Sequence, residues 1–284
     1  MFQTMRKMLA GLAAAAALTA IAAPAAIAQE KSLLDDVLAR GKLIVGTGST
    51  NAPWHFKDEQ GNLVGFDIDI AKMIATGLFK DPSKIEFVEQ SSDARIPNVT
   101  TGKVDITCQF MTVTAERAQQ VNFTIPYYRE GVALLLAAGG KYKTYDEMKA
   151  AGGGVTVSVL QNVYAEDMVH AALPEAKVDQ YDSVDLIYEA VNSGRADAAA
   201  TDQSSAKWLI VTTPGKYVDS GYGWNPQSYS CAVKRGDQDW LNFVNTTLHE
   251  AMTGVEFGSY STSFKKWFGV DLPPPAIGFP VEYQ

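Results

Sequence analysis

Segments with the composition of strands alternate with helical segments along residues 42–200. The first cycle of this alternation predicts strands over 42–46, 84–89 and 104–108 and helices over 67–78 and 93–101. The second cycle predicts strands over 131–137, 155–159, 177–181 and 196–200 and helices over 145–150, 163–171 and 184–193. Because short connections join the two kinds of segment, the pattern predicts an α/β fold with mostly parallel sheets covered by helices.

The segments that flank this alternation carry signals of their own. A short helix is expected over 32–40 and an amphipathic helix over 237–252. Residues 58–62 have the polar and glycine content of a hairpin turn. A loop is expected over 221–227, which contains glycine and proline, and a strand is expected over 228–234.

Residues 1–28 have the layout of a secretory signal peptide. Arg6 and Lys7 precede an apolar stretch over 9–22, and a small-residue cleavage site ends at Ala28. The alternative, a membrane anchor, needs about 20 apolar residues, and this stretch is shorter. No cysteine stands at the cleavage point, so no lipid anchor is expected. The mature chain is therefore expected to be free in the periplasm of a Gram-negative cell.

The charge of the mature chain argues against nucleic acid as a partner. The whole chain has 24 basic and 32 acidic side chains and a formal charge of −8. The leader holds two of the basic groups and no acidic group, so its removal makes the charge −10. An acidic surface keeps a secreted protein soluble and repels phosphate backbones.

Cysteine and histidine usage limits the cofactors. Cys108 and Cys231 are the only two cysteines. In an oxidising compartment such a pair favours a disulfide, and two separate buried thiols are the alternative. His55, His170 and His249 are scattered along the chain, so the sequence predicts no metal site and no cofactor.

The run Gly65-Phe66-Asp67-Ile68-Asp69-Ile70 follows a strand and opens a helix. It resembles the signature of the family 3 periplasmic solute-binding proteins, which capture polar amino acids for ABC importers. The resemblance implies the two-lobed periplasmic binding protein (type II) fold, in which each lobe is a mostly parallel sheet flanked by helices and two crossing strands form the hinge. Lobe 1 is expected over 29–130 and 227–284, and lobe 2, inserted in it, over 131–226.

Two further blocks resemble the parts of this family that hold the ligand's zwitterion. Thr112-Val113-Thr114-Ala115-Glu116-Arg117 resembles the block in which an arginine receives the α-carboxylate, so Arg117 is the expected carboxylate ligand with Thr112 beside it. In the block over 193–202, Asp202 is expected to bind the α-ammonium. A surface arginine and a helix cap are the structural alternatives for these two residues. Asp105 and Asp197 are expected to tie down backbone donors.

A narrower resemblance is to the subgroup that binds glutamate and aspartate. It rests on Ser92-x-x-Arg95-Ile96-Pro97, Cys108 nine residues before Arg117, Tyr229-x-Cys231, and Lys266-Trp267-Phe268 before Pro273-Pro274. In that subgroup the equivalents of Ser92 and Arg95 contact the ligand's side-chain carboxylate. The resemblance therefore favours an acidic or amide ligand, and a helix-surface charge is the alternative for Arg95.

The chain departs from that subgroup at several positions. Gly48 stands where the acidic-ligand proteins place a second arginine, and Gln109-Phe110-Met111 replaces a stretch of small hydroxyl residues. Phe110 would enlarge the apolar wall. Asn162 lies in a turn where the family has glycine and hydroxyl residues. Gln109, Phe110 and Asn162 remain candidate ligand contacts.

Aromatic residues stand in the loop where the family supplies a lid over the ligand. Trp54 and Phe56 are the candidates for this lid, and core packing is the alternative for either. His55 lies between them. A lone histidine is more often a hydrogen-bonded structural residue than a ligand group, so His55 is not assigned to the site.

The favoured function is that of a binding module. Two lobes would close over an L-amino acid, and the closed monomer would deliver it to an inner-membrane ABC permease. One alternative is a periplasmic enzyme similar to cyclohexadienyl dehydratase, with Glu166 or Asp167 as an acid in the cleft. Another is a soluble partner of a sensor kinase that uses the same binding site.

Overall fold

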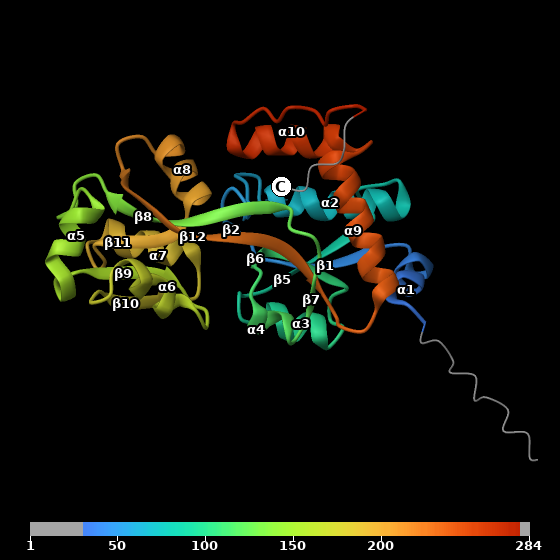
Figure 1. Ribbon diagram of the computed structural model, residues 1–284, viewed down its shortest axis with the longest axis horizontal. Coiled ribbons are helices and arrows are strands. Elements are labelled where there is room, and N and C mark those ends of the chain that lie inside the picture. The colour runs from blue at the N-terminus through green and yellow to red at the C-terminus, as the bar shows by residue number, and fades with distance from the viewer. Residues whose placement is uncertain (1–30, 279–284) are drawn as a thin grey trace, which may run out of the picture. The chain divides into compact units, whose positions relative to one another are not determined.

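The computed structural model describes residues 31–278, so the predicted signal peptide lies outside the described residues (Figure 1). The strands are β1 Leu43–Thr47, β2 Thr50–Asn51, β3 His55–Lys57, β4 Leu63–Val64, β5 Ile85–Glu89, β6 Ile106–Thr112, β7 Asn122–Phe123, β8 Tyr128–Ala137, β9 Thr156–Leu160, β10 Lys177–Tyr181, β11 Ala198–Asp202 and β12 Tyr217–Val233. The helices are α1 Leu33–Arg40, α2 Phe66–Phe79, α3 Arg95–Thr100, α4 Ala115–Ala118, α5 Tyr145–Ala151, α6 Ala165–Ala172, α7 Val184–Asn192, α8 Gln203–Thr212, α9 Gln238–Thr253 and α10 Phe257–Phe268, with a 3₁₀ turn, η1, at Gly152–Gly154.

The main sheet has two parallel groups of strands joined by two antiparallel ones. Its order is β10-β9-β11-β8-β12-β6-β1-β5. In the first strand group β1 pairs in parallel with β5 and β6, and in the second strand group β9 pairs in parallel with β10 and β11. The crossing strands β8 and β12 run antiparallel to each other between the two groups (Figure 1). The expected α/β class with mostly parallel groups of strands is confirmed.

Each strand group has its own core. Along β8, Val132, Leu134 and Leu136 pack into one apolar cluster, and Ala133 and Leu135 pack into another. Successive side chains of a strand point to opposite faces, so the second strand group is buried on both sides. Helices α5 and α6 cover the first of these clusters, and α7 and α8 cover the second.

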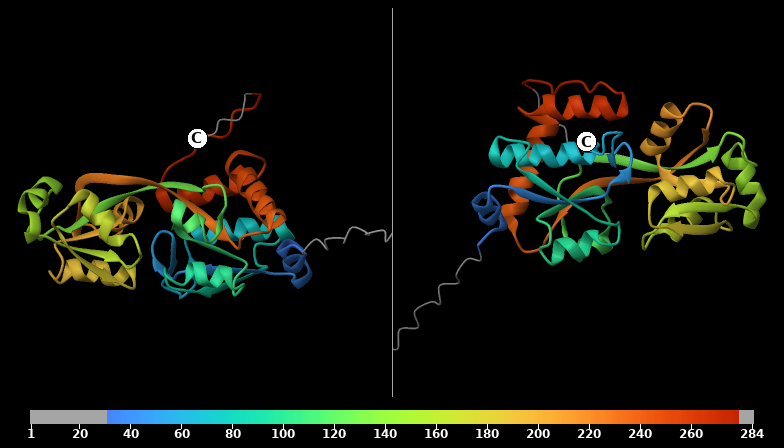
Figure 2. Two further views of the ribbon diagram at one scale, coloured as in Figure 1. Left: turned by 60° about the horizontal axis from the view of Figure 1, so that its bottom comes forward. Right: turned by 180° about the vertical axis from the view of Figure 1, so that it is seen from behind.

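The core of the first strand group is built from helices that are distant in sequence. Trp54, Phe66 and Trp240 share one cluster of buried side chains to which β1, β6, α2, α9 and α10 all contribute. Figure 2 shows α2, α9 and α10 on one side of this group, where α2 contacts both of the other helices. The expected two lobes thus correspond to the two strand groups, each with its own buried clusters, and β8 and β12 join them.

The signature run begins α2 in a way that requires glycine. Gly65 has φ 131° and ψ 173°, and a Cβ there would lie 2.2 Å from the carbonyl oxygen of Trp54. Only glycine tolerates this backbone approach. The second acid of the run, Asp69, accepts hydrogen bonds of 2.7 Å from Ser263 Oγ and from Trp267 Nε1. The run therefore attaches α10 to α2.

A disulfide joins β6 to its antiparallel neighbour β12. The Sγ atoms of Cys108 and Cys231 are 2.03 Å apart, and the Cα atoms are 4.4 Å apart. The alternative of two separate thiols is wrong. The expectation for the two structural acids is confirmed, because Asp105 accepts the backbone N–H of Ile44 and Asp197 accepts that of Thr156.

The expected loop over 221–227 is wrong, because these residues belong to β12. Gly223 and Trp224 pair with β8, and the pairing register shifts on either side of them. Gly221 and Asn225 have φ of 80° and 53° at these irregularities. Residues that resemble a turn in sequence therefore form bulges within a strand of 17 residues. The hairpin turn over 58–62 is confirmed by the antiparallel pairing of β3 with β4.

Candidate ligand-binding site

A cavity of about 830 Å³ lies against both strand groups and the crossing strands. Six of the predicted ligand residues line it, namely Arg95, Phe110, Thr112, Arg117, Asn162 and Asp202. The other four, Trp54, Phe56, Ser92 and Gln109, are not among its lining residues. Its lining also includes Tyr164, Asp167, Gln227 and Tyr229, of which only Asp167 had been considered for a cleft role.

Arg117 lies in the short helix α4, where the hydroxyl of Thr114 accepts its backbone N–H. Arg117 is only 7% exposed, and its Nη1 donates to the carbonyl of Thr112 at 2.9 Å. The guanidinium carbon lies 5.1 Å from the ring centroid of Tyr164, a cation–π distance. Burial lowers the pKa of Arg117. The structure therefore holds this cation in a fixed position at the cavity wall, where an anion is its natural partner.

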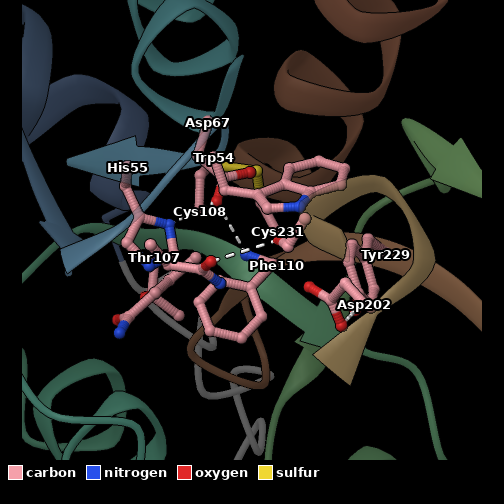
Figure 3. A network of polar contacts seen from close by, with 12 residues as sticks. Trp54, His55, Asp67, Thr107, Cys108, Phe110, Asp202, Tyr229 and Cys231 are labelled. Carbon is pink, nitrogen blue, oxygen red and sulfur yellow. Dashed lines mark hydrogen bonds and ion pairs between the residues drawn. A yellow bond between two sulfur atoms is a disulfide. The ribbon is translucent and has the colours of Figure 1, made fainter. Parts of the chain in front are cut away.

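Asp202 ends β11 on the same cavity (Figure 3). Its Oδ1 accepts the hydroxyl of Tyr229 at 2.5 Å, while its buried Oδ2 accepts no hydrogen bond from the described residues. Burial raises the pKa of Asp202 well above its usual range, and repulsion from Glu130 adds to this. The site thus contains a carboxylate oxygen that lacks a donor, which a cationic ligand group would supply.

Arg95 brings a second guanidinium to the cavity. It is 4% exposed, so it is not the helix-surface charge considered as the alternative. Nε donates to the carbonyl of Ser92 at 2.7 Å, and Nη1 donates to the carbonyl of Gln109 at 3.1 Å. Burial, with repulsion from Arg117 as the second cause, lowers the pKa of Arg95 to about 9. Both guanidinium groups remain charged at neutral pH, so the site suits a ligand with more than one acceptor group.

Two further predicted residues line the cavity, and their polar side-chain atoms already bond to other protein groups. Thr112 Oγ1 donates to Gln227 Oε1 at 2.8 Å. Asn162 donates from Nδ2 to the carbonyl of Leu160 at 2.9 Å, and its Oδ1 accepts the backbone N–H of Tyr164 at 2.9 Å. Asn162 therefore shapes the turn between β9 and α6.

The two aromatic lid candidates pack into the core instead. Trp54 is fully buried, and its Nε1 donates to Ser204 Oγ at 3.0 Å. Phe56 packs edge-on against Trp267 with ring centroids 5.6 Å apart, and it also contacts Trp208. Their positions outside the cavity follow from these partners, which come from α8 and α10.

Ser92 and Gln109 are in contact with cavity residues but do not line the cavity themselves. Ser92 contributes its carbonyl to Arg95. Gln109 is buried, and its Oε1 accepts Nε2 of Gln90 at 3.0 Å. Gln109 and Phe110 are neighbours on β6, and only Phe110 lines the cavity.

Sequence reasoning missed the roles of Tyr164 and Tyr229. Tyr164 lies over Arg117, and its hydroxyl donates to Glu116 Oε2 at 2.6 Å. Tyr229 donates to Asp202. Tyr229 belongs to the Tyr-x-Cys match, and Tyr164 ends the turn that departs from the family pattern. Both tyrosines therefore lie in motifs that the sequence analysis describes, but no sequence pattern predicts their contacts with Arg117 and Asp202.

Two features of other protein classes are absent from residues 31–278. No group of three or more His, Cys, Asp or Glu side chains within this range could hold a metal ion. Among the helices of the same range, none is long and apolar enough to cross a membrane.

The chain is similar to several known proteins. The pattern of the bacterial extracellular solute-binding proteins, family 3, matches residues 43–270. The ABC transporter glutamine-binding protein GlnH of Bacillus subtilis is 28% identical over 85% of this chain and 86% of its own length. A glutamate/aspartate import solute-binding protein of Salmonella typhimurium is 26% identical over 98% and 92%. The solved ancestral amino acid-binding protein AncCDT-1, a precursor of cyclohexadienyl dehydratase, is 33% identical over 84% of this chain and 100% of its own, with a TM-score of 0.74.

Proposed function

The chain belongs to the bacterial extracellular solute-binding proteins of family 3, and we propose that it captures a polar L-amino acid with an acidic or amide side chain. The observation that carries the proposal is the pairing of opposite charges on one cavity. Arg117 would bind the α-carboxylate, and the unpartnered Oδ2 of Asp202 would accept the α-ammonium. An amino-acid zwitterion satisfies both needs at once.

The preference for an acidic or amide side chain rests on Arg95. Its two donors to backbone carbonyls use part of the guanidinium, which has five N–H groups in all, and the residue still lines the cavity. A carboxylate or an amide oxygen of the ligand would accept from it. The relatives named for glutamine and for glutamate and aspartate are consistent with this class of ligand.

We divide the chain into lobe 1, residues 29–130 and 227–284, and lobe 2, residues 131–226, with β8 and β12 as the hinge. Ligand contacts from both lobes would stabilise a closed form, which is a shift of population. The closed monomer would dock on an inner-membrane ABC permease from the periplasm, after removal of the leader.

The test is a titration of the mature protein, residues 29–284, after its bound ligand has been removed by denaturation and refolding. Thermal shift against the twenty L-amino acids, prephenate and arogenate identifies the ligand, because a ligand bound only by the folded state raises the melting temperature. A selective shift with Glu, Asp, Gln or Asn that disappears in Arg117→Ala supports the proposal. Arg195→Ala is the matched control, because Arg195 is exposed and lies outside the cavity.

Two results would contradict the proposal. One is a shift with amino acids of another class alone. The other is turnover of prephenate or arogenate without any shift by an amino acid, which would favour the enzyme, with Asp167 as the acid on the cavity.

A further inference from the structure

Strand β6 is irregular at the point where it reaches the cavity. Its partner β12 pairs Ser230 with Met111 and Ala232 with Thr107, so between these pairs one residue of β12 is opposite three of β6. Phe110 lies in this bulge with φ 33°, an uncommon conformation for a residue with a large side chain. The bulge aims the Phe110 ring at the cavity and leaves backbone groups without partners in the sheet.

Side chains satisfy these backbone groups from two directions. Arg95 donates to the carbonyl of Gln109. Asp67, the first acid of the signature run, accepts the backbone N–H of Phe110 at 2.9 Å through Oδ2 (Figure 3). Asp67 is fully buried, and its Oδ1 accepts the hydroxyl of Tyr127 at 2.6 Å.

The same carboxylate fixes the ring that lies behind Phe110. His55 Nδ1 is 2.8 Å from Asp67 Oδ2, and the His55 ring stacks on the Phe110 ring with centroids 4.5 Å apart and planes 10° apart (Figure 3). Burial lowers the pKa of His55, which favours the neutral ring, and Nδ1 of that ring can donate to the carboxylate. A Cβ on Gly48 would lie 2.6 Å from His55 Cδ2, so the ring occupies space that any side chain at residue 48 would need.

We propose that Asp67 is a positioning residue of the ligand site, which sets the place of the Phe110 wall through the backbone of Phe110 and the ring of His55. The inference rests on the proposed function. Asp67 does not line the cavity, so its effect on a ligand passes through Phe110. The role of the signature acid is thus to hold the wall against which the ligand's side chain packs.

The matched pair of variants is Asp67→Asn and Asp69→Asn. Both acids lie in the first turn of α2 and each accepts side-chain hydrogen bonds, but Asp69 is bonded to Ser263 and Trp267 of α10, outside the cavity. Isothermal titration with L-glutamate and L-glutamine should show a Kd about tenfold or more higher in Asp67→Asn, the effect of about 1.4 kcal/mol. The Kd of Asp69→Asn for the same two amino acids should stay within about twofold of the wild-type value.

Hydrogen exchange of the ligand-free proteins supplies a readout that does not depend on the ligand. Peptides covering 106–112 should exchange faster in Asp67→Asn and at the wild-type rate in Asp69→Asn. Gly48→Ala serves as a second variant if Asp67→Asn does not fold. It displaces the His55 ring without altering the carboxylate of Asp67. It should change the ratio of the Kd for L-glutamate to the Kd for L-glutamine.

Each outcome decides a separate question. Wild-type affinity and wild-type exchange in Asp67→Asn would overturn the inference, as would equal losses of affinity in Asp67→Asn and Asp69→Asn. An unchanged ratio of Kd values in Gly48→Ala would also contradict it. If the wild-type protein binds neither amino acid nor any other in the screen, the proposed function fails, and the exchange over 106–112 alone decides whether Asp67 holds Phe110.

Discussion

Replacement of Asp202 by asparagine removes the negative charge that would meet the ligand's ammonium group. The amide retains an oxygen that can accept the hydroxyl of Tyr229, and no hydrogen bond from the side chain of Asp202 caps α8. The substitution therefore changes the charge of the cavity and leaves the surrounding hydrogen bonds in place.

The size of the effect follows from the burial of the carboxylate. Removing one partner of a buried, hydrogen-bonded charge pair costs about 2–5 kcal/mol. Because the bond to Tyr229 survives in the variant, the lower part of this range applies, about 2–3 kcal/mol. At 1.4 kcal/mol for each factor of ten, the Kd should rise about 30- to 150-fold.

Although the substitution weakens binding, it should not destabilise the ligand-free protein. The pKa of Asp202 is raised well above its usual range by burial and by Glu130, so the folded state disfavours the ionised form. For an acid, this means that stability is lost as the pH rises from the unfolded-state pKa through the folded-state pKa. The neutral amide removes that loss, and the ligand-free variant should be at least as stable as wild type at neutral pH.

Isothermal titration calorimetry over a pH series measures how much the charge of Asp202 contributes to affinity and over which pH range that contribution is lost. Wild-type affinity should decrease as the pH falls through the raised pKa of Asp202, because a protonated carboxyl binds an ammonium group poorly. The Asp202→Asn variant should be independent of pH in that window. Asp167→Asn is the control, because Asp167 is an exposed acid on the same cavity. An affinity of Asp202→Asn within about threefold of wild type, or an equal loss in Asp167→Asn, would refute the reasoning.

Three other variants test separate parts of the structure. The double variant Cys108→Ser, Cys231→Ser should have a free energy of unfolding about 5 kcal/mol lower by urea denaturation, because the disulfide closes a loop with a sequence separation of 123. A loss under about 1 kcal/mol would contradict this entropic contribution. Gly65→Ala should cost more than about 1 kcal/mol by the same assay, because its Cβ would meet the Trp54 carbonyl, and wild-type stability would contradict the contact. Arg117→Lys should weaken amino-acid binding about tenfold or more, since an ammonium cannot make the paired bonds of a guanidinium; full affinity would exclude paired bonds.

The alternation of strands and helices could be predicted from the sequence because each segment carries its own periodicity. The errors arise where distant partners determine the structure. Gly221 and Asn225 read as turn residues, but pairing with β8 keeps them in β12 as bulges. Helix α10 is rich in Ser, Gly and aromatic residues, which are weak helix formers, and it packs through Phe264 and Phe268 against Phe66.

The candidate site was predictable in part because two blocks of the sequence resemble those in which the family holds its ligand. Arg117 and Asp202 stand in blocks whose local sequence places them at the ends of strands or the starts of helices. The burial of Trp54 depends on Ser204, 150 residues later, and no local pattern encodes that contact. The link from Asp67 to Phe110 spans 43 residues and depends on a bulge that only the pairing of β6 with β12 reveals.

The disulfide can form only after the chain has emerged as far as Cys231. A chain that emerges from its amino terminus presents Cys108 long before Cys231, and β8, β9, β10 and β11 all emerge in the interval. The second strand group can therefore pack its two clusters while the thiol of Cys108 still lacks its partner. The first strand group also needs α9 and α10, which follow Cys231, so it is completed last. During that interval the thiol of Cys108 has no partner in its own chain, so it stays available for exchange with other thiols.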